Sequence, residues 1–101
     1  MNFEEMFEWD DAKNEYNIQE HSVAFKEAAT VFKDNNAIMF DDYAHTNEAE
    51  ERFIIIGRSE YQRILMVCHC YRENDDKIRI ITARKANKKE RKLYESGGKS
   101  W

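Results

Sequence analysis

Four arginines stand at or within segments of this chain that have the composition of β-strands: Arg52, Arg63, Arg79 and Arg84. An ordinary sheet favours apolar or threonine side chains at such positions. Each guanidinium is a permanent cation whose planar fork of N–H donors matches the oxygens of a phosphate. Any one of these arginines is better explained as a rim residue that pairs with a carboxylate. The group as a whole indicates a phosphate-binding surface, provided that several members share one face.

A histidine and two cysteines lie next to each other in the long apolar segment 63–72. Because side chains alternate along a strand, His69 shares a face with Arg63, Leu65, Val67 and Tyr71, whereas Cys68 and Cys70 point the other way. His69 therefore lies among apolar residues and is either a hydrogen-bonded, partly buried residue or a proton-transfer group of near-neutral pKa. Alternate residues diverge and no second Cys or His pair has ligand spacing, so we expect no metal site.

Charge is distributed unevenly along the chain, although the net charge is only −4. Residues 1–51 carry fourteen carboxylates and three lysines, a balance of −11, whereas residues 77–101 carry nine Lys and Arg and two Glu, a balance of +7. Within the basic segment, Lys88, Arg91 and Lys92 fall on one side of an expected helix. That side is suited to a nucleic-acid backbone, although a solvated surface or a docking face for an acidic partner explains it equally well.

The elements that must position these residues follow from periodicity and from turn and cap signals. We expect a short first strand within Phe3–Trp9, a helix from Asp10 or Asp11 to about Glu20, and a second helix over Val23–Phe32. Four further strands and a last helix follow, at Ala37–Phe40, Arg52–Arg58, Arg63–Arg72, Lys77–Arg84 and Asn87–Glu95. The four-residue gaps Ser59–Gln62 and Glu73–Asp76 suit hairpins and hence an antiparallel meander with the segment 63–72 at its centre. This order predicts an α+β fold.

Length and composition predict one domain over residues 1–101, with an apolar fraction of 42%, three glycines and no proline. The acidic start is unlike a signal peptide, and no apolar run approaches the roughly 18 residues of a membrane span. Cys68 and Cys70 are expected to be reduced thiols. We therefore expect a cytoplasmic protein that does not contact a membrane.

Several blocks of the sequence form a recognisable set: Phe7-Glu8-Trp9-Asp10 with Lys13, Asn17 and His21; Phe25-Lys26-Glu27-Ala28 to Val31-Phe32; Glu51-Arg52 with Ile56-Gly57; His69; and Arg79-Ile80-Ile81-Thr82-Ala83-Arg84 with Glu90-Arg91 and Tyr94. Taken together, these blocks resemble the BrnT toxin family. The blocks cover nearly the whole chain in order. Ser22 and Ala24 stand where the family commonly has a glycine and a capping Ser, Thr or Asp, so the joint between the first two helices is expected to differ locally.

The resemblance implies a small RelE-like ribonuclease-toxin fold and a type II toxin that arrests translation by cleaving RNA. It also implies a cognate, BrnA-like antitoxin as partner, with promoter DNA bound only through the complex. The competing possibility is a catalytically inactive module that acts through antitoxin pairing and promoter occupancy.

Metal-free RNA cleavage uses the 2′-hydroxyl as nucleophile, and it requires proton transfer and stabilisation of a charged phosphorane. We expect Arg52, Arg63, Arg79 and Arg84 to bind phosphates while His69 or His21 exchanges protons, with Glu51 as a weaker candidate base and no cofactor. Lys13, His21, Lys88 and Arg91 are the remaining candidates for contact with RNA.

Overall fold

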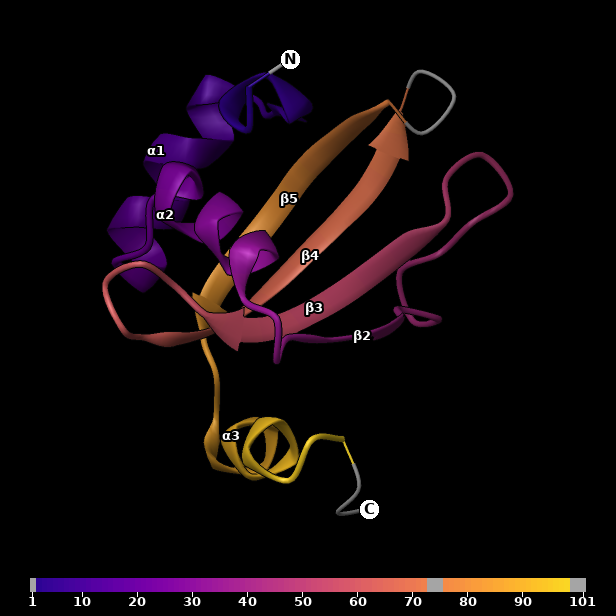
Figure 1. Ribbon diagram of the computed structural model, residues 1–101. Helices are drawn as coiled ribbons and strands as arrows, with labels where there is room; N and C mark the ends of the chain where they lie inside the picture. Colours follow the sequence, from indigo (N-terminus) through magenta and orange to yellow (C-terminus); the bar gives the residue numbers. More distant parts are fainter. Residues whose placement is uncertain (1, 73–75, 99–101) are drawn as a thin grey trace.

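A five-stranded sheet in the order β1-β5-β4-β3-β2 forms the centre of the protein (Figure 1). The computed structural model describes residues 2–72 and 76–98. Strands β2 to β5 are antiparallel neighbours, and β1 runs parallel to β5. The strands are β1 (Phe7–Glu8), β2 (Ile38–Asp41), β3 (Arg52–Arg58), β4 (Ile64–Arg72) and β5 (Lys77–Lys85), and the helices are α1 (Asp11–His21), α2 (Phe25–Thr30) and α3 (Lys88–Glu95). The predicted α+β class, the order of elements and the central place of β4 are confirmed.

Two elements are shorter than predicted. Only Phe7 and Glu8 pair with β5, at Ile78 and Arg79, and the residues before them form a 3₁₀ turn, Glu4–Met6. The second helix tightens into another 3₁₀ turn, Val31–Lys33, after Thr30. Of the second predicted hairpin turn, Glu73–Asp76, residues 73–75 lie outside the described part of the chain.

Apolar side chains pack on both faces of the sheet. On one face, α1, α2 and the 3₁₀ turns cover a cluster that includes Phe25, Val31, Leu65, Val67 and Ile80 (Figure 1). On the other face, α3 covers only the end of the sheet near Ile56 and Met66, against which Leu93 and Tyr94 pack. The remainder of this second face is not covered by a described helix (Figure 1). None of the described helices is long and apolar enough to cross a membrane.

Strand β5 contains one residue more than the stretch of β4 that it faces. Cys68 pairs with Thr82 and His69 pairs with Ile80, so Ile81 is the extra residue of a β-bulge. After the bulge, the side chains of β5 alternate between the two faces in the opposite phase. Ile78 and Ile80 before the bulge and Ala83 after it therefore all join the core on the helix-covered face, although 83 is odd and the other two numbers are even. Arg79 and Arg84 consequently share the opposite face.

Asn17 joins α1 to the part of β5 that β1 does not reach. Its Nδ2 donates to the carbonyl oxygens of Ala83 and Val23, both at 2.8 Å, and its Oδ1 accepts from the Ala83 amide at 3.2 Å. This buried side chain thus bonds to both backbone polar groups of Ala83, as a neighbouring strand would.

The structure shows how the joint between α1 and α2 accommodates Ser22 and Ala24. Ser22 ends α1 with a left-handed backbone, φ 57°, which is the conformation that glycine adopts most easily. Ala24 precedes α2 and has no capping side chain, but Asn14 on α1 accepts a hydrogen bond from the Phe25 amide at 2.8 Å. A neighbouring helix therefore supplies the cap that residue 24 lacks.

Replacing Asn17 with alanine should lower the free energy of unfolding by about 2–4 kcal/mol, because buried backbone groups of β5 lose their partners. Urea denaturation of the two proteins measures the difference. Gln19→Ala, an exposed change on the same helix, is the control and should alter stability by less than about 0.5 kcal/mol. Equal stabilities of Asn17→Ala and Gln19→Ala would show that Asn17 does not hold the sheet edge.

Replacing Ser22 with glycine should raise the free energy of unfolding by about 0.5–1 kcal/mol, because the left-handed residue no longer carries a Cβ atom. Ser22→Ala keeps the Cβ and should not stabilise the protein. Thermal denaturation distinguishes the two variants, and an equal shift in both would contradict the conformational explanation.

Candidate functional site

Arg52, Arg79 and Arg84 lie on the face of the sheet opposite α1 and α2, and we call these three residues the arginine face. Cys70 of β4 pairs with Arg52 of β3 on one side and with Arg79 of β5 on the other, so the two arginines flank one thiol in a single row. Neighbouring strands are roughly 4.8 Å apart, which places their backbones roughly 10 Å from each other. Arg84 pairs with Met66, which lies four residues before Cys70 in β4, and its side chain bonds to Glu90 in the first turn of α3.

Each arginine of this face is held by one carboxylate. Arg52 donates from Nε to Glu50 at 2.8 Å, Arg79 from Nη1 to Glu8 at 2.7 Å, and Arg84 from both Nη atoms to Glu90 at 2.8 and 3.0 Å. The arginine side chains remain 28%, 31% and 35% exposed, respectively. The single-bond, partly exposed pairs of Arg52 and Arg79 are of the kind that contributes only about 0–1 kcal/mol each, so an arriving phosphate can replace Glu50 or Glu8 at little cost.

The carboxylates also fix the orientation of the guanidinium groups. The hydrogen bond from Arg52 is the main reason that the pKa of Glu50 lies below its ordinary value. Glu90 additionally accepts from the Asn87 amide, while the Asn87 side chain accepts from the Glu90 amide, and together they form the capping box of α3. Arg84 is thereby tied to the first turn of the helix.

Arg63 is separated from the other three predicted phosphate ligands. It precedes β4 and turns toward the helices, where it donates from Nε to Glu27 at 2.9 Å and from Nη2 to the Ser22 carbonyl at 3.0 Å. Glu27 is buried, which by itself raises the pKa of its carboxyl, but bonds from Arg63 and Ser59 outweigh burial and hold that pKa below its ordinary value. Arg63 thus compensates a buried charge, and the expectation that it joins a shared arginine surface is corrected.

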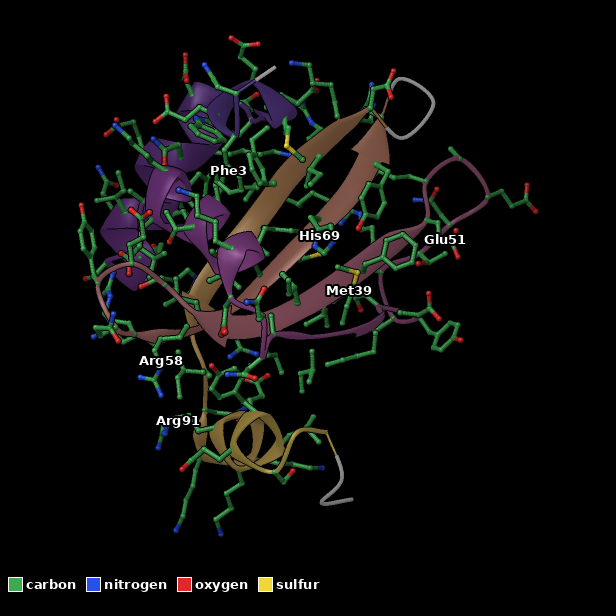
Figure 2. All side chains as sticks on the ribbon, viewed as in Figure 1. Phe3, Met39, Glu51, Arg58, His69 and Arg91 are labelled. Carbon is green, nitrogen blue, oxygen red and sulfur yellow. The ribbon has the colours of Figure 1, made fainter. Side chains whose placement is uncertain are left out.

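His69 is on β4, the central strand of the sheet, and its side chain is enclosed between the sheet and Phe32 (Figure 2). It is 0% exposed and packs edge-on against Phe32 and Tyr71, with ring centroids 4.9 and 5.4 Å away. Burial lowers its pKa to about 4, and its Nε2 has no hydrogen-bond partner among the described residues. Of the two explanations left open by the sequence, the core residue fits this position. Proton exchange with a bound substrate does not, because solvent cannot reach the ring.

The two cysteines lie under the arginine face as buried free thiols. Burial is the first cause that raises the pKa of Cys68 to about 12, and burial likewise raises the pKa of Cys70. Neither thiol is therefore a ready nucleophile at neutral pH. Among the described residues, no group of three or more His, Cys, Asp or Glu side chains is arranged to hold a metal ion.

The four residues predicted to contact RNA fall into two places. Lys88 and Arg91 are exposed on α3, the helix tied to Arg84, and Arg91 donates from Nη1 to the Ala86 carbonyl at 2.8 Å (Figure 2). Lys13 and His21 are exposed on α1, which packs along β5, and the described contacts do not bring them to the arginine face. Their contact with RNA stays a prediction.

One pair of residues near the arginine face was not singled out by the sequence analysis. Asp42, next to Arg52 across β2 and β3, is buried and binds the Nδ1 atom of His45 at 2.9 Å. The three-residue spacing of Asp42 and His45 was the available signal, since a single turn brings such residues together. Arg52, Asp42 and His45 place a cation, an anion and an imidazole at one end of the sheet.

Comparisons with known proteins agree with the architecture. The family model described as "Ribonuclease toxin, BrnT, of type II toxin-antitoxin system" matches residues 9–90. The 1.1 Å crystal structure of the Brucella abortus ribonuclease toxin BrnT is similar with a TM-score of 0.61 and 22% sequence identity, over 82% of this chain and 99% of that one. At this identity the likeness shows the fold. No curated protein matches the chain.

The buried, neutral state of His69 predicts a pH dependence of stability. Its pKa is lower in the folded protein than in the unfolded chain, so between about pH 6.5 and 4 only the unfolded chain takes up a proton. Stability is complete above this window and falls by roughly 1 kcal/mol per pH unit within it. His69→Leu should remove this loss between pH 7.5 and 5, as urea denaturation at both values can measure. Parallel changes in the two proteins would contradict the assignment of His69 to the core.

Proposed function

Because this chain belongs to the BrnT family of ribonuclease toxins of type II toxin–antitoxin systems, we propose that it arrests translation as a metal-independent endoribonuclease. The observation that carries the proposal is the arginine face, with Arg52 and Arg79 in one row of the sheet and Arg84 beside α3. Three guanidinium groups on an uncovered face are suited to the charge of an RNA backbone. A cognate antitoxin that occupies the same face would neutralise the toxin.

In this proposal the arginines act on the charge of the reacting phosphate. Cleavage by the 2′-hydroxyl passes through a phosphorane whose extra negative charge must be stabilised, and prearranged N–H donors do this most effectively. Arg52 and Arg79 flank the site of the scissile phosphate above Cys70, and Arg84 holds a neighbouring phosphate. Glu50, Glu8 and Glu90 keep the guanidinium groups oriented until RNA replaces them.

The distribution of charge supports the same direction of approach. The last element, α3, carries Lys88, Lys89, Arg91 and Lys92 and adjoins Arg84 through the capping box. These side chains attract the backbone without reading its sequence. The exposed carboxylates of α1, Asp11, Glu15 and Glu20, lie on the opposite side of the sheet and repel RNA, so the substrate is guided toward the arginine face and α3.

The proposal predicts that Arg79→Ala lowers RNA cleavage at least about 100-fold, the usual cost of removing one donor to a developing oxyanion. The fold should be retained, because the lost Glu8 pair is partly exposed. Cleavage of a mixed-sequence transcript by the purified protein, with growth after induction in bacteria, provides the measurement.

Lys26→Ala, which removes a cation from α2 on the opposite side of the sheet, is the matched control and should cleave like the unmodified protein. A folded Arg52→Ala/Arg79→Ala double variant that still cleaves and arrests growth would overturn the role of the arginine face. An unmodified chain that binds its antitoxin but neither cleaves RNA nor arrests growth would instead identify the inactive binding module.

A further inference from the structure

We infer that His45 is the catalytic residue that accepts the proton of the attacking 2′-hydroxyl, and that Asp42 positions it. The inference rests on the proposed ribonuclease function and deepens it, because the arginine face supplies charge but no group that exchanges protons readily. The evidence is the geometry of the turn that follows β2.

The turn that carries His45 is tightly bonded to the arginine face. The Asp42 amide donates to the Arg52 carbonyl at 2.9 Å, and the Arg52 amide donates to the Thr46 hydroxyl at 2.9 Å. Both ends of the segment 42–46 are thus fixed to the backbone of one arginine of the proposed site. These bonds hold the turn that carries His45 beside the backbone of Arg52.

Asp42 determines which nitrogen of His45 can accept a proton. The Nδ1 atom lies 2.9 and 3.1 Å from the two Asp42 carboxylate oxygens. An ionised carboxylate only accepts hydrogen bonds, so Nδ1 must carry the hydrogen, and the lone pair of a neutral ring is then on Nε2. A buried carboxylate orients the general base of serine hydrolases in the same way.

Asp42 and His45 differ in exposure: the carboxylate is buried and the imidazole is accessible. The Asp42 side chain is 8% exposed and the His45 side chain is 66% exposed. The Cys68 thiol, 3.5 Å from Asp42 Oδ2, adds a second donor that secures the carboxylate from below. The His45 imidazole is therefore accessible to a bound molecule, which is not true of the buried His69.

The step balances as an intramolecular transesterification. His45 Nε2 takes the 2′-hydroxyl proton while the 2′-oxygen forms a bond to phosphorus, and the bond from phosphorus to the 5′-oxygen breaks. Water protonates the departing 5′-oxygen, and the imidazolium later returns its proton to solvent. The products are a 2′,3′-cyclic phosphate and a 5′-hydroxyl end.

The test uses the purified full chain, a mixed-sequence transcript of several hundred nucleotides and added imidazole. His45→Ala should cleave about 100-fold or more slowly, the usual size of general acid–base catalysis. Imidazole in the buffer should restore its rate at least tenfold and should not accelerate the unmodified protein or Arg79→Ala. Glu48→Ala, an exposed change in the same loop, should cleave normally.

Asp42 is tested through its dependence on His45. If it only positions the imidazole, Asp42→Asn slows the unmodified protein but does not slow His45→Ala further, whereas two independent losses would multiply. A His45→Ala variant that cleaves within threefold of the unmodified protein, or that imidazole does not restore, overturns this inference alone. An unmodified protein that leaves the transcript intact overturns the proposed function as well.

Discussion

The single extra residue in β5 is the constraint on which the candidate site depends. Regular alternation would place Arg79 and Arg84, five residues apart, on opposite faces of the sheet. Ile81 shifts the register between Cys68 and His69, so that both arginines point away from the helices. The same shift keeps Ile78, Ile80 and Ala83 together in the core. One irregularity therefore serves packing and site formation at once, as is common for bulges near active sites.

Polar side chains have different tasks on the two faces. On the helix-covered face, Asn17 bonds to the backbone of Ala83, and Arg63 compensates the buried Glu27. Asn17 and Glu27 are buried, so the loss of Asn17 or of Arg63 leaves unpaired polar atoms in the core. On the open face, Arg52, Arg79 and Arg84 are bound by partly exposed carboxylates, and such pairs exchange partners at little cost. The arginines are similarly exposed, so the difference lies in their partners: Glu27 is 4% exposed, whereas Glu50, Glu8 and Glu90 are 20–29% exposed.

The sequence predicted the elements well because their signals are local. The apolar run of β4, the capping box at Asn87 and Glu90, and the alternation that separates His69 from Cys68 all appear as predicted. The bulge in β5 leaves no such local signal. The direction of Arg63 depends on Glu27, 36 residues away, and the burial of His69 depends on Phe32 and Tyr71 around it. The roles of Arg63 and His69 thus depend on neighbours that are distant in the sequence, and the residue types alone do not reveal them.

The distribution of charge is compatible with the proposed binding of RNA, although the chain has a net negative charge. A uniform charge of −4 would repel RNA, but the carboxylates are concentrated in the first half of the chain. On the face of the sheet opposite α1 and α2, Glu50, Glu8 and Glu90 are each bound to an arginine, which cancels their repulsion there, while Asp42 is bound to His45. When a phosphate displaces Glu8 or Glu50, the freed carboxylate is already partly solvated and is not left buried without a partner. In the proposed ribonuclease, binding of RNA exchanges one anion for another at a preoriented guanidinium, and the basic α3 beside Arg84 provides the surplus charge that favours the exchange.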